Sequence, residues 1–256
     1  MQIVSWNMQN KRESWRFLVD RHQDYDFAFV GEACVPPPSA QRIADAGEWN
    51  IPYETWDLQL GEKRRKYRQE VLGIRGGWRL DRLDRHEAVE AANPSIPPEH
   101  DRIFRRWSRV AIASNSDEQY CLVCVVSGHG QAQSLPLLAG GVRAALKRHG
   151  YDSAVPIIIA GDLTTNEQKS PEMFARMSKI GLPWLGPAGA NYIHVSGRKP
   201  HQRETPETAW RRLNHVFVSE DLADRTSVTA LNQPDELHPD CWGPSDHCRI
   251  RIEIDR

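Results

Sequence analysis

Short runs of apolar residues recur along the chain, and their length and periodicity predict strands interleaved with a few helices. Residues 155–160 form a continuous apolar run, which is typical of a central strand buried on both faces. Residues 249–254 alternate polar with apolar side chains, which predicts a strand with one buried face. The same reasoning predicts further strands at residues 3–6, 27–30, 53–58, 70–74, 109–113, 120–126 and 215–219.

Helical patterns are fewer. Residues 12–23 and 134–148 each carry apolar side chains at helical spacing, so each predicts an amphipathic helix. After a run of three prolines, Ser39 is expected to cap a short helix that begins at Ala40. Residues 81–106 are polar and contain prolines, which predicts a surface insertion of irregular structure.

The order of these elements indicates the fold class. Strands and helices are mixed throughout, without an internal repeat or a linker, so we expect one α/β domain over residues 1–256. A chain of 256 residues can bury the core of one large domain. The net charge of −1 excludes an overall basic surface for nucleic acid. Basic clusters within residues 63–68, 102–109 and 198–212 can still attract a polyanion locally.

The ends of the chain and its cysteines bear on where the protein acts. The longest apolar stretches are too short to span a membrane, and the first residues lack the pattern of a secretory signal. We therefore expect a protein that is cytoplasmic as synthesised, with export by a route that leaves no cleavable signal still open. Five cysteines, an odd number without framework spacing, do not predict a disulfide scaffold. A monomer is expected.

Polar side chains follow or precede the predicted strands again and again. Because the ends of neighbouring strands meet at one rim of a sheet, residues far apart in the sequence can converge there. The residues in such places are Asn7, Glu32, His129, Asp162, Asn214, Asp246 and His247.

These residue types fit metal-assisted hydrolysis of a phosphate ester. Glu32, with Asn7 and Asp246, offers the hard oxygen ligands that suit Mg²⁺ or Mn²⁺. Asp162 could orient or deprotonate the attacking water, and His247 could lie on the phosphate. This chemistry requires no serine or cysteine nucleophile.

Six short motifs resemble those of the endonuclease/exonuclease/phosphatase superfamily, the deoxyribonuclease I-like proteins, in order and approximate spacing. They are Trp6-Asn7, Gly31-Glu32, Ser127-Gly128-His129, Gly161-Asp162-Leu163-Thr164, Arg212-Leu213-Asn214-His215-Val216-Phe217-Val218-Ser219 and Ser245-Asp246-His247. Within the first forty residues, the sequence most resembles the catalytic subunit of cytolethal distending toxin. That closer resemblance rests on Trp6-Asn7-Met8-Gln9, Trp15, Gly31-Glu32-Ala33 and Pro37-Pro38-Ser39-Ala40.

The resemblance implies a fold and a set of roles. The fold is a four-layered α/β sandwich of two packed mixed sheets flanked by helices, with the site at one edge. The implied metal ligands are Glu32, Asn7 and Asp246, and Asp162 handles the water. The implied phosphate contacts are His129, His247 and Arg109, with Glu70 as a candidate partner of His129.

Two positions depart from the family pattern. Thr164 stands where an asparagine is usual, and its hydroxyl can still donate one hydrogen bond to a phosphate oxygen over a shorter reach. Asn214 stands where the family has the aspartate that orients the histidine at position 247. An asparagine can accept a hydrogen bond from the imidazole but carries no charge, so we expect His247 to be less basic than usual.

Three functions remain open on this evidence. The first is a divalent-metal-dependent phosphodiesterase that acts as a DNA endonuclease, with DNA held by the basic segments at 63–68 and 198–212. The second is a phosphomonoesterase that acts on phosphoinositides or a similar phosphorylated substrate. The third is a binding module in which Thr164 and Asn214 record weakened catalysis.

Overall fold

The structure is a computed structural model that describes residues 1–52, 68–83, 108–127, 130–152, 154–192, 212–231 and 244–255. Its strands form two sheets. The first sheet has the order β10 (Thr226–Leu231), β11 (Arg249–Ile254), β1 (Gln2–Asn7), β2 (Phe27–Ala33) and β3 (Arg68–Gly73). The second has the order β4 (Arg79–Arg82), β5 (Ser108–Ser114), β6 (Gln119–Val126), β7 (Ile157–Asp162), β9 (Asn214–Val218) and β8 (Trp184–Gly186).

Both sheets are mixed, because each contains one parallel pair among antiparallel neighbours. β1 runs parallel to β2, and β6 runs parallel to β7. The alternation of side chains along β1 shows how the layers are built. Ile3 lies in the apolar cluster between the sheets, whereas Val4 and Trp6 lie in the cluster beneath the outer helices.

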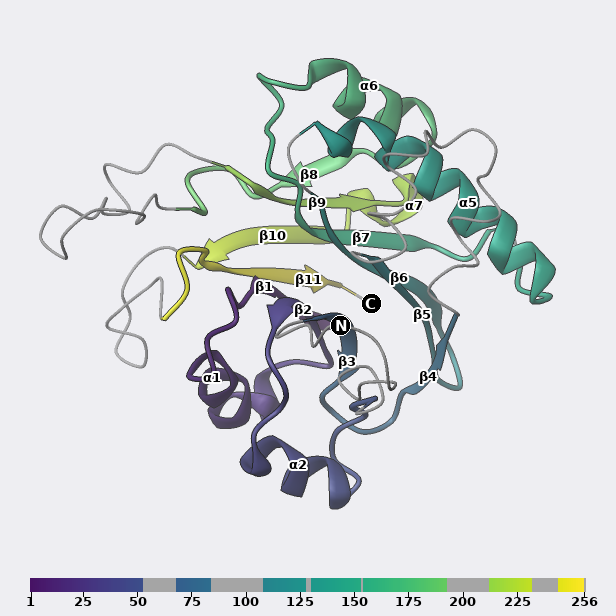
Figure 1. Ribbon diagram of the computed structural model, residues 1–256. Helices are drawn as coiled ribbons and strands as arrows, with labels where there is room; N and C mark the ends of the chain where they lie inside the picture. Colours follow the sequence, from purple (N-terminus) through teal and green to yellow (C-terminus); the bar gives the residue numbers. More distant parts are fainter. Residues whose placement is uncertain are drawn as a thin grey trace, which may run out of the picture.

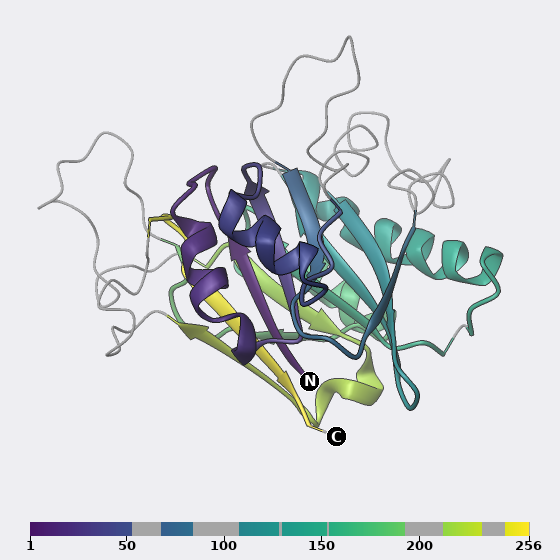
Figure 2. The same cartoon turned by 90° about the horizontal axis from the view of Figure 1, so that it is seen from below.

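The two sheets pack face to face, and helices cover their outer faces (Figure 1). Helices α1 (Ser14–Asp20) and α2 (Pro38–Asp45) lie across the first sheet, as the view from below shows (Figure 2). Helices α5 (Leu135–Arg148) and α6 (Pro171–Lys179) cover the second. The predicted four-layered α/β sandwich is therefore confirmed.

Shorter elements complete the described part of the chain. They are the 3-10 turns η1 (His22–Asp24) and η3 (Gln131–Ser134) and the one-turn helix α7 (Glu220–Ala223). Among the described residues, no helix combines the length and the apolar character needed to cross a bilayer.

Several predicted boundaries differ from the observed ones. The expectation that Ser39 caps a helix is wrong, because α2 begins two residues before the predicted start at Ala40, at Pro38, whose fixed φ suits a first helical position. The predicted irregular insertion overlaps β4 at Asp81 and Arg82, which pair with β5. The strand predicted at 53–58 lies outside the described residues. Elements that were not predicted from the sequence are α6, α7, η3, β4, β8 and β10.

The register of the strands brings polar residues to one end of both sheets. Asn7 pairs with Gly31 across β1 and β2, which places Glu32 next to the end of β1. Asp162 ends β7 and pairs with Asn214 at the start of β9. The sheet edge that the sequence predicted for the site is therefore formed by strands from both halves of the sandwich.

Candidate active site

Asn7 connects the two sheets at this edge. Its side-chain nitrogen donates to Asp162 Oδ2 at 3.0 Å and lies 3.4 Å from Glu32 Oε1. Its side-chain oxygen accepts the backbone N–H of Gln9 at 3.0 Å, so the amide orientation is fixed. The structure therefore brings Asn7, Glu32 and Asp162 together, as predicted from their places at strand ends.

Backbone strain marks two of the predicted residues. Glu32 has a φ of 46° and Thr164 a φ of 48°, values that place both in the left-handed region. Such conformations cost about 1–3 kcal/mol for residues other than glycine and cluster at functional sites. Before Glu32, the absence of a side chain at Gly31 allows close packing, since an added Cβ would lie 2.9 Å from Val126 Cγ2.

Asp162 is the most enclosed carboxylate of the site. Its Oδ1 accepts the backbone N–H of Thr164 at 2.8 Å, while its Oδ2 accepts from Asn7. Burial raises the pKa of Asp162 to about 7, and the nearby carboxylates of Glu32 and Asp246 act in the same direction. The group is thus poised to exchange a proton near neutral pH.

Asp246 faces the same space with one oxygen unsatisfied. Gln9 donates to its Oδ2 at 2.7 Å, whereas its Oδ1 is buried without a hydrogen-bond donor. Burial raises the pKa of Asp246 to about 6, and the negative charge of Glu32 raises it further. Burial also raises the pKa of Glu32 itself. Neighbouring carboxylates, one of which has an oxygen without a hydrogen-bond donor, are suitable ligands for a hard divalent cation.

The described residues do not contain a ready-made cluster of metal-binding side chains. Within the described ranges, no group of three or more His, Cys, Asp or Glu residues is arranged to hold an ion. The carboxylates of Glu32 and Asp246, with the amide of Asn7, nevertheless fit Mg²⁺ or Mn²⁺ in donor type. The unsatisfied Oδ1 of Asp246 is the observation that supports this fit.

His247 points its Nε2 into the site. This atom lies 3.7 Å from Asp162 Oδ2 and 3.5 Å from Asp246 Oδ1. The backbone is held on both sides of the ring: Trp6 Nε1 donates to the His247 carbonyl at 2.8 Å, and the His247 N–H donates to Ser245 Oγ at 3.1 Å. Burial lowers the pKa of His247 to about 3, in the direction expected from the sequence.

The contact between Asn214 and His247 differs from the expected one. From the sequence, the amide oxygen of Asn214 is expected to accept a hydrogen bond from the imidazole. The structure instead places the side-chain nitrogen of Asn214 2.9 Å from Nδ1 of His247. Two residues beside this pair were not predicted. Asn191 contacts Asn214 by several hydrogen bonds, and the Tyr192 ring lies 4.7 Å from the His247 ring, centroid to centroid. No strand-end position or motif marks either residue.

The predicted phosphate-binding residues are engaged within the protein. Arg109 is buried, with its Nε 3.4 Å from Glu70 Oε2. The Thr164 hydroxyl donates to the Ser127 carbonyl at 2.8 Å, so its hydrogen is used inside the fold. His129, the predicted partner of Glu70, lies outside the described residues. Contact of Arg109 and Thr164 with a phosphate therefore stays a prediction.

His215 has the structural role expected of it. It lies on the opposite side of β9 from the site, where its Nε2 contacts the Thr165 carbonyl at 2.8 Å and its ring packs against Phe174 and Trp184. Burial lowers the pKa of His215 to about 4, so the ring is neutral at physiological pH.

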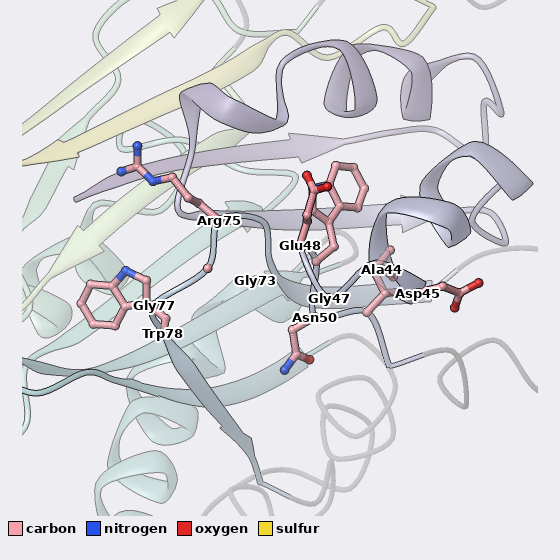
Figure 3. A pocket seen from close by; sticks show the side chains of 12 residues that line it. Ala44, Asp45, Gly47, Glu48, Asn50, Gly73, Arg75, Gly77 and Trp78 are labelled. Carbon is pink, nitrogen blue, oxygen red and sulfur yellow. The ribbon is translucent and has the colours of Figure 1, made fainter.

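A cavity of about 510 Å³ lies away from this site. It adjoins Gly73, which pairs with Phe27 at the start of β2, whereas Glu32 lies near the other end of that strand. Figure 3 shows Arg75 and Trp78 among its lining residues. The candidate site is thus defined by convergent polar groups and not by this hollow.

Comparison with known proteins supports the fold. No family model and no curated protein matches the sequence. Among solved structures, the endonuclease domain of TRAS1, a telomere-specific non-LTR retrotransposon, is 11% identical with a TM-score of 0.62, covering 100% of this chain and 98% of that one. A Bacteroides thetaiotaomicron mannosyl-6-phosphatase is 13% identical with a TM-score of 0.61, covering 100% of both chains. Truncated Caenorhabditis elegans TDP2 is 12% identical with a TM-score of 0.60, covering 100% and 97%.

These similarities define the class of fold. The chain has the fold of the endonuclease/exonuclease/phosphatase proteins, which is the fold that the resemblance of its six motifs implies. The closer resemblance to the toxin subunit stays a prediction. Because one fold can carry different reactions, the activity has to be argued from the site.

Proposed function

We propose that this protein is a divalent-metal-dependent phosphodiesterase that acts on DNA as an endonuclease. The observation that carries the proposal is the buried carboxylate of Asp162, which accepts from Asn7 of the opposite sheet and lies 3.7 Å from the His247 imidazole. A carboxylate and an imidazole held together in this way suit attack by water on a phosphate ester.

Asp162 is the proposed general base. A pKa of about 7 makes its carboxylate able to take a proton from water near neutral pH. The water oxygen bonds to phosphorus, its proton passes to Asp162, and the ester P–O bond breaks. The departing oxygen takes its proton from solvent. His247 lies on the phosphate and stabilises the charge of the transition state.

Glu32, Asn7 and Asp246 are the residues that would hold Mg²⁺ or Mn²⁺. When bound, the cation neutralises charge on the scissile phosphate and on the departing oxygen. Gln9 positions Asp246 for this role through its 2.7 Å hydrogen bond to Oδ2, which leaves the unsatisfied Oδ1 for the cation.

DNA is the proposed substrate because proteins with a similar structure act on DNA or bind it. One is an endonuclease domain, and another is D. rerio TDP2 complexed with a single-strand DNA product, 14% identical with a TM-score of 0.57. The basic segments proposed to hold DNA lie mostly outside the described residues. Of their arginines, Arg68 is buried in β3 and Arg212 forms an ion pair with Glu167.

Two alternatives have specific support. A mannosyl-6-phosphatase shares the fold at a similar TM-score, which favours a phosphomonoesterase that acts on phosphoinositides or another phosphorylated compound. The internal hydrogen bond of Thr164 and the amide at Asn214 favour a weakened, binding-only site.

A substrate panel separates these functions. Wild type, Asp162→Ala and the control Asp117→Ala, an exposed position in the β5–β6 turn, would be incubated with supercoiled plasmid, RNA and phosphoinositides in Mg²⁺, Mn²⁺ or EDTA. We expect metal-dependent nicking by wild type and the control, and a loss of about 10²- to 10⁴-fold in Asp162→Ala. Phosphate release without nicking would instead indicate the phosphomonoesterase, and inactivity on the whole panel the binding module.

A further inference from the structure

We infer that Asn191 is a positioning residue, which turns the side-chain nitrogen of Asn214 toward His247 and thereby places the imidazole proton on Nε2. The inference rests on hydrogen bonds among three buried residues, namely Asn191 between β8 and β9, Asn214 at the start of β9 and His247 before β11. The tautomer itself follows from these contacts alone. Its role on a phosphate rests on the proposed function.

The orientation of the Asn191 amide is set by backbone groups, which have fixed polarity. Its Oδ1 accepts the N–H groups of Leu213 at 2.9 Å and Asn214 at 3.1 Å. Its Nδ2 donates to the Asn214 carbonyl at 2.8 Å. Turning the amide over would place a donor against two donors and an acceptor against an acceptor. The side chain is fully buried, so no water would relieve these contacts.

The fixed Asn191 determines in turn how Asn214 is oriented. The Asn214 Nδ2 lies 3.2 Å from the Asn191 backbone oxygen and 3.3 Å from Asn191 Oδ1. An oxygen in this place would face two oxygens, so the nitrogen must occupy it. The same nitrogen lies 2.9 Å from Nδ1 of His247. An N–H group facing Nδ1 requires a lone pair there, and a neutral ring then carries its proton on Nε2.

The segment that contains Asn191 also holds the strand that follows His247. The backbone oxygen of Asn191 accepts the N–H of Cys248 at 3.1 Å, and Tyr192 forms an isolated β-bridge with His247. Asn191 therefore fixes both partners of the amide–imidazole contact. Because both of these contacts are made by the backbone, a change of the Asn191 side chain should alter the ring's proton placement while the segment stays paired with His247 and Cys248.

This tautomer changes what His247 can do. Its Nε2–H points toward the space between Asp162 Oδ2 and Asp246 Oδ1. In that place a neutral ring can donate a hydrogen bond to a phosphate oxygen without carrying a charge. A carboxylate at position 214 would favour the proton on Nδ1, as in Ser-His-Asp triads, and would leave Nε2 as an acceptor.

Nitrogen NMR of the full chain tests the tautomer directly. Protein labelled with ¹⁵N in its histidines would be measured near pH 7, without metal and with Mg²⁺, and His247→Gln would identify the His247 signals. Protonated and unprotonated ring nitrogens have well-separated shifts. We expect a protonated Nε2 and an unprotonated Nδ1. A proton on Nδ1, or on both nitrogens, would overturn the inference.

Variants at position 191 test the positioning role. Asn191→Ala should convert the single His247 tautomer into a mixture, and Asn191→Ser serves the same purpose if the alanine variant does not fold. Where the panel above finds a substrate, kcat should fall by about 10- to 100-fold with little change in KM. An unchanged wild-type tautomer in a folded variant would refute the role of Asn191. The NMR outcome stands even if every substrate fails, so the two proposals can fail separately.

Discussion

At the scale of single residues, the site consists of carboxyl groups that the fold buries close to one another. Asp162, Asp246 and Glu32 all have raised pKa values because the fold encloses them near one another. Asn7 partly compensates by donating to Asp162 and lying beside Glu32. Without a cation, the folded protein therefore keeps protons on carboxyl groups that an unfolded chain would release.

A pH-dependent stability difference follows for Asp162→Asn. Because the folded pKa of Asp162 is about 7, above the ordinary 3.8, its stabilising contribution is complete below pH 3.8 and lost as pH rises through about 7. The asparagine does not titrate. We therefore expect the variant to gain stability relative to wild type between about pH 4 and pH 7. Urea unfolding in EDTA at both ends of this range measures the difference in the free energy of unfolding between variant and wild type. A difference that does not change with pH would contradict the assigned pKa.

Asn214→Asp tests the amide orientation by stability. A carboxylate oxygen would face the two Asn191 oxygens that now lie 3.2 and 3.3 Å from the Asn214 nitrogen. We expect a loss of about 1–3 kcal/mol in the free energy of unfolding at pH 7. Asn50→Asp is the matched control, because its exposed Oδ1 accepts from Arg82 and a carboxylate can do the same. Equal stability of both variants would argue against the orientation.

At the scale of elements, the strands that carry the site could be predicted because they are buried. The apolar run at 155–160 predicts most of β7, and the strand extends to Asp162 because its last two residues pair with β9. The edge strand β10 gives no such signal, since its side chains alternate between half-buried and exposed. Asn191 escapes prediction for another reason: its role arises from contacts with residues more than twenty positions away.

Within strand β7, Gly161 is a position where a side chain cannot be added without a steric clash. In β7 its φ is 151°, and a Cβ there would lie 1.8 Å from the Val125 carbonyl oxygen of the parallel strand β6. Gly161→Ala should therefore destabilise the protein by about 2–4 kcal/mol, in the upper part of the range for single substitutions. Gly140→Ala is the control: this exposed glycine of α5 has open space around its Cβ, so alanine should add about 0.5–1 kcal/mol. Thermal unfolding should show a lower melting temperature for Gly161→Ala and a higher one for Gly140→Ala.

At the scale of the whole molecule, stability and site geometry share one interface. The apolar cluster between the sheets joins residues of β1, β2, β6, β7 and β11. The same strands present Asn7, Asp162 and, just before β11, His247. Loosening the interface should therefore separate the two halves of the site.

Phe29→Ala examines this coupling. The ring is buried between the sheets, so its removal should cost about 3–5 kcal/mol. If residues 1–256 form one domain, as the sequence predicts, far-UV circular dichroism and tryptophan fluorescence should report one shared unfolding transition. Two separated transitions would show that the sheets unfold independently.

The place of β11 has a consequence for how the protein is made. This strand is synthesised after β1 and β2, yet it lies inside the first sheet, between β10 and β1. Asp246 and His247 lie just before it, separated from it by Cys248, so a nascent chain can carry Glu32 and Asp162 while these two residues are still in the ribosome. In biosynthetic terms, the proposed site is complete only after the segment that leads into β11 has left the ribosome, because Asp246 and His247 follow Glu32 and Asp162 in the chain.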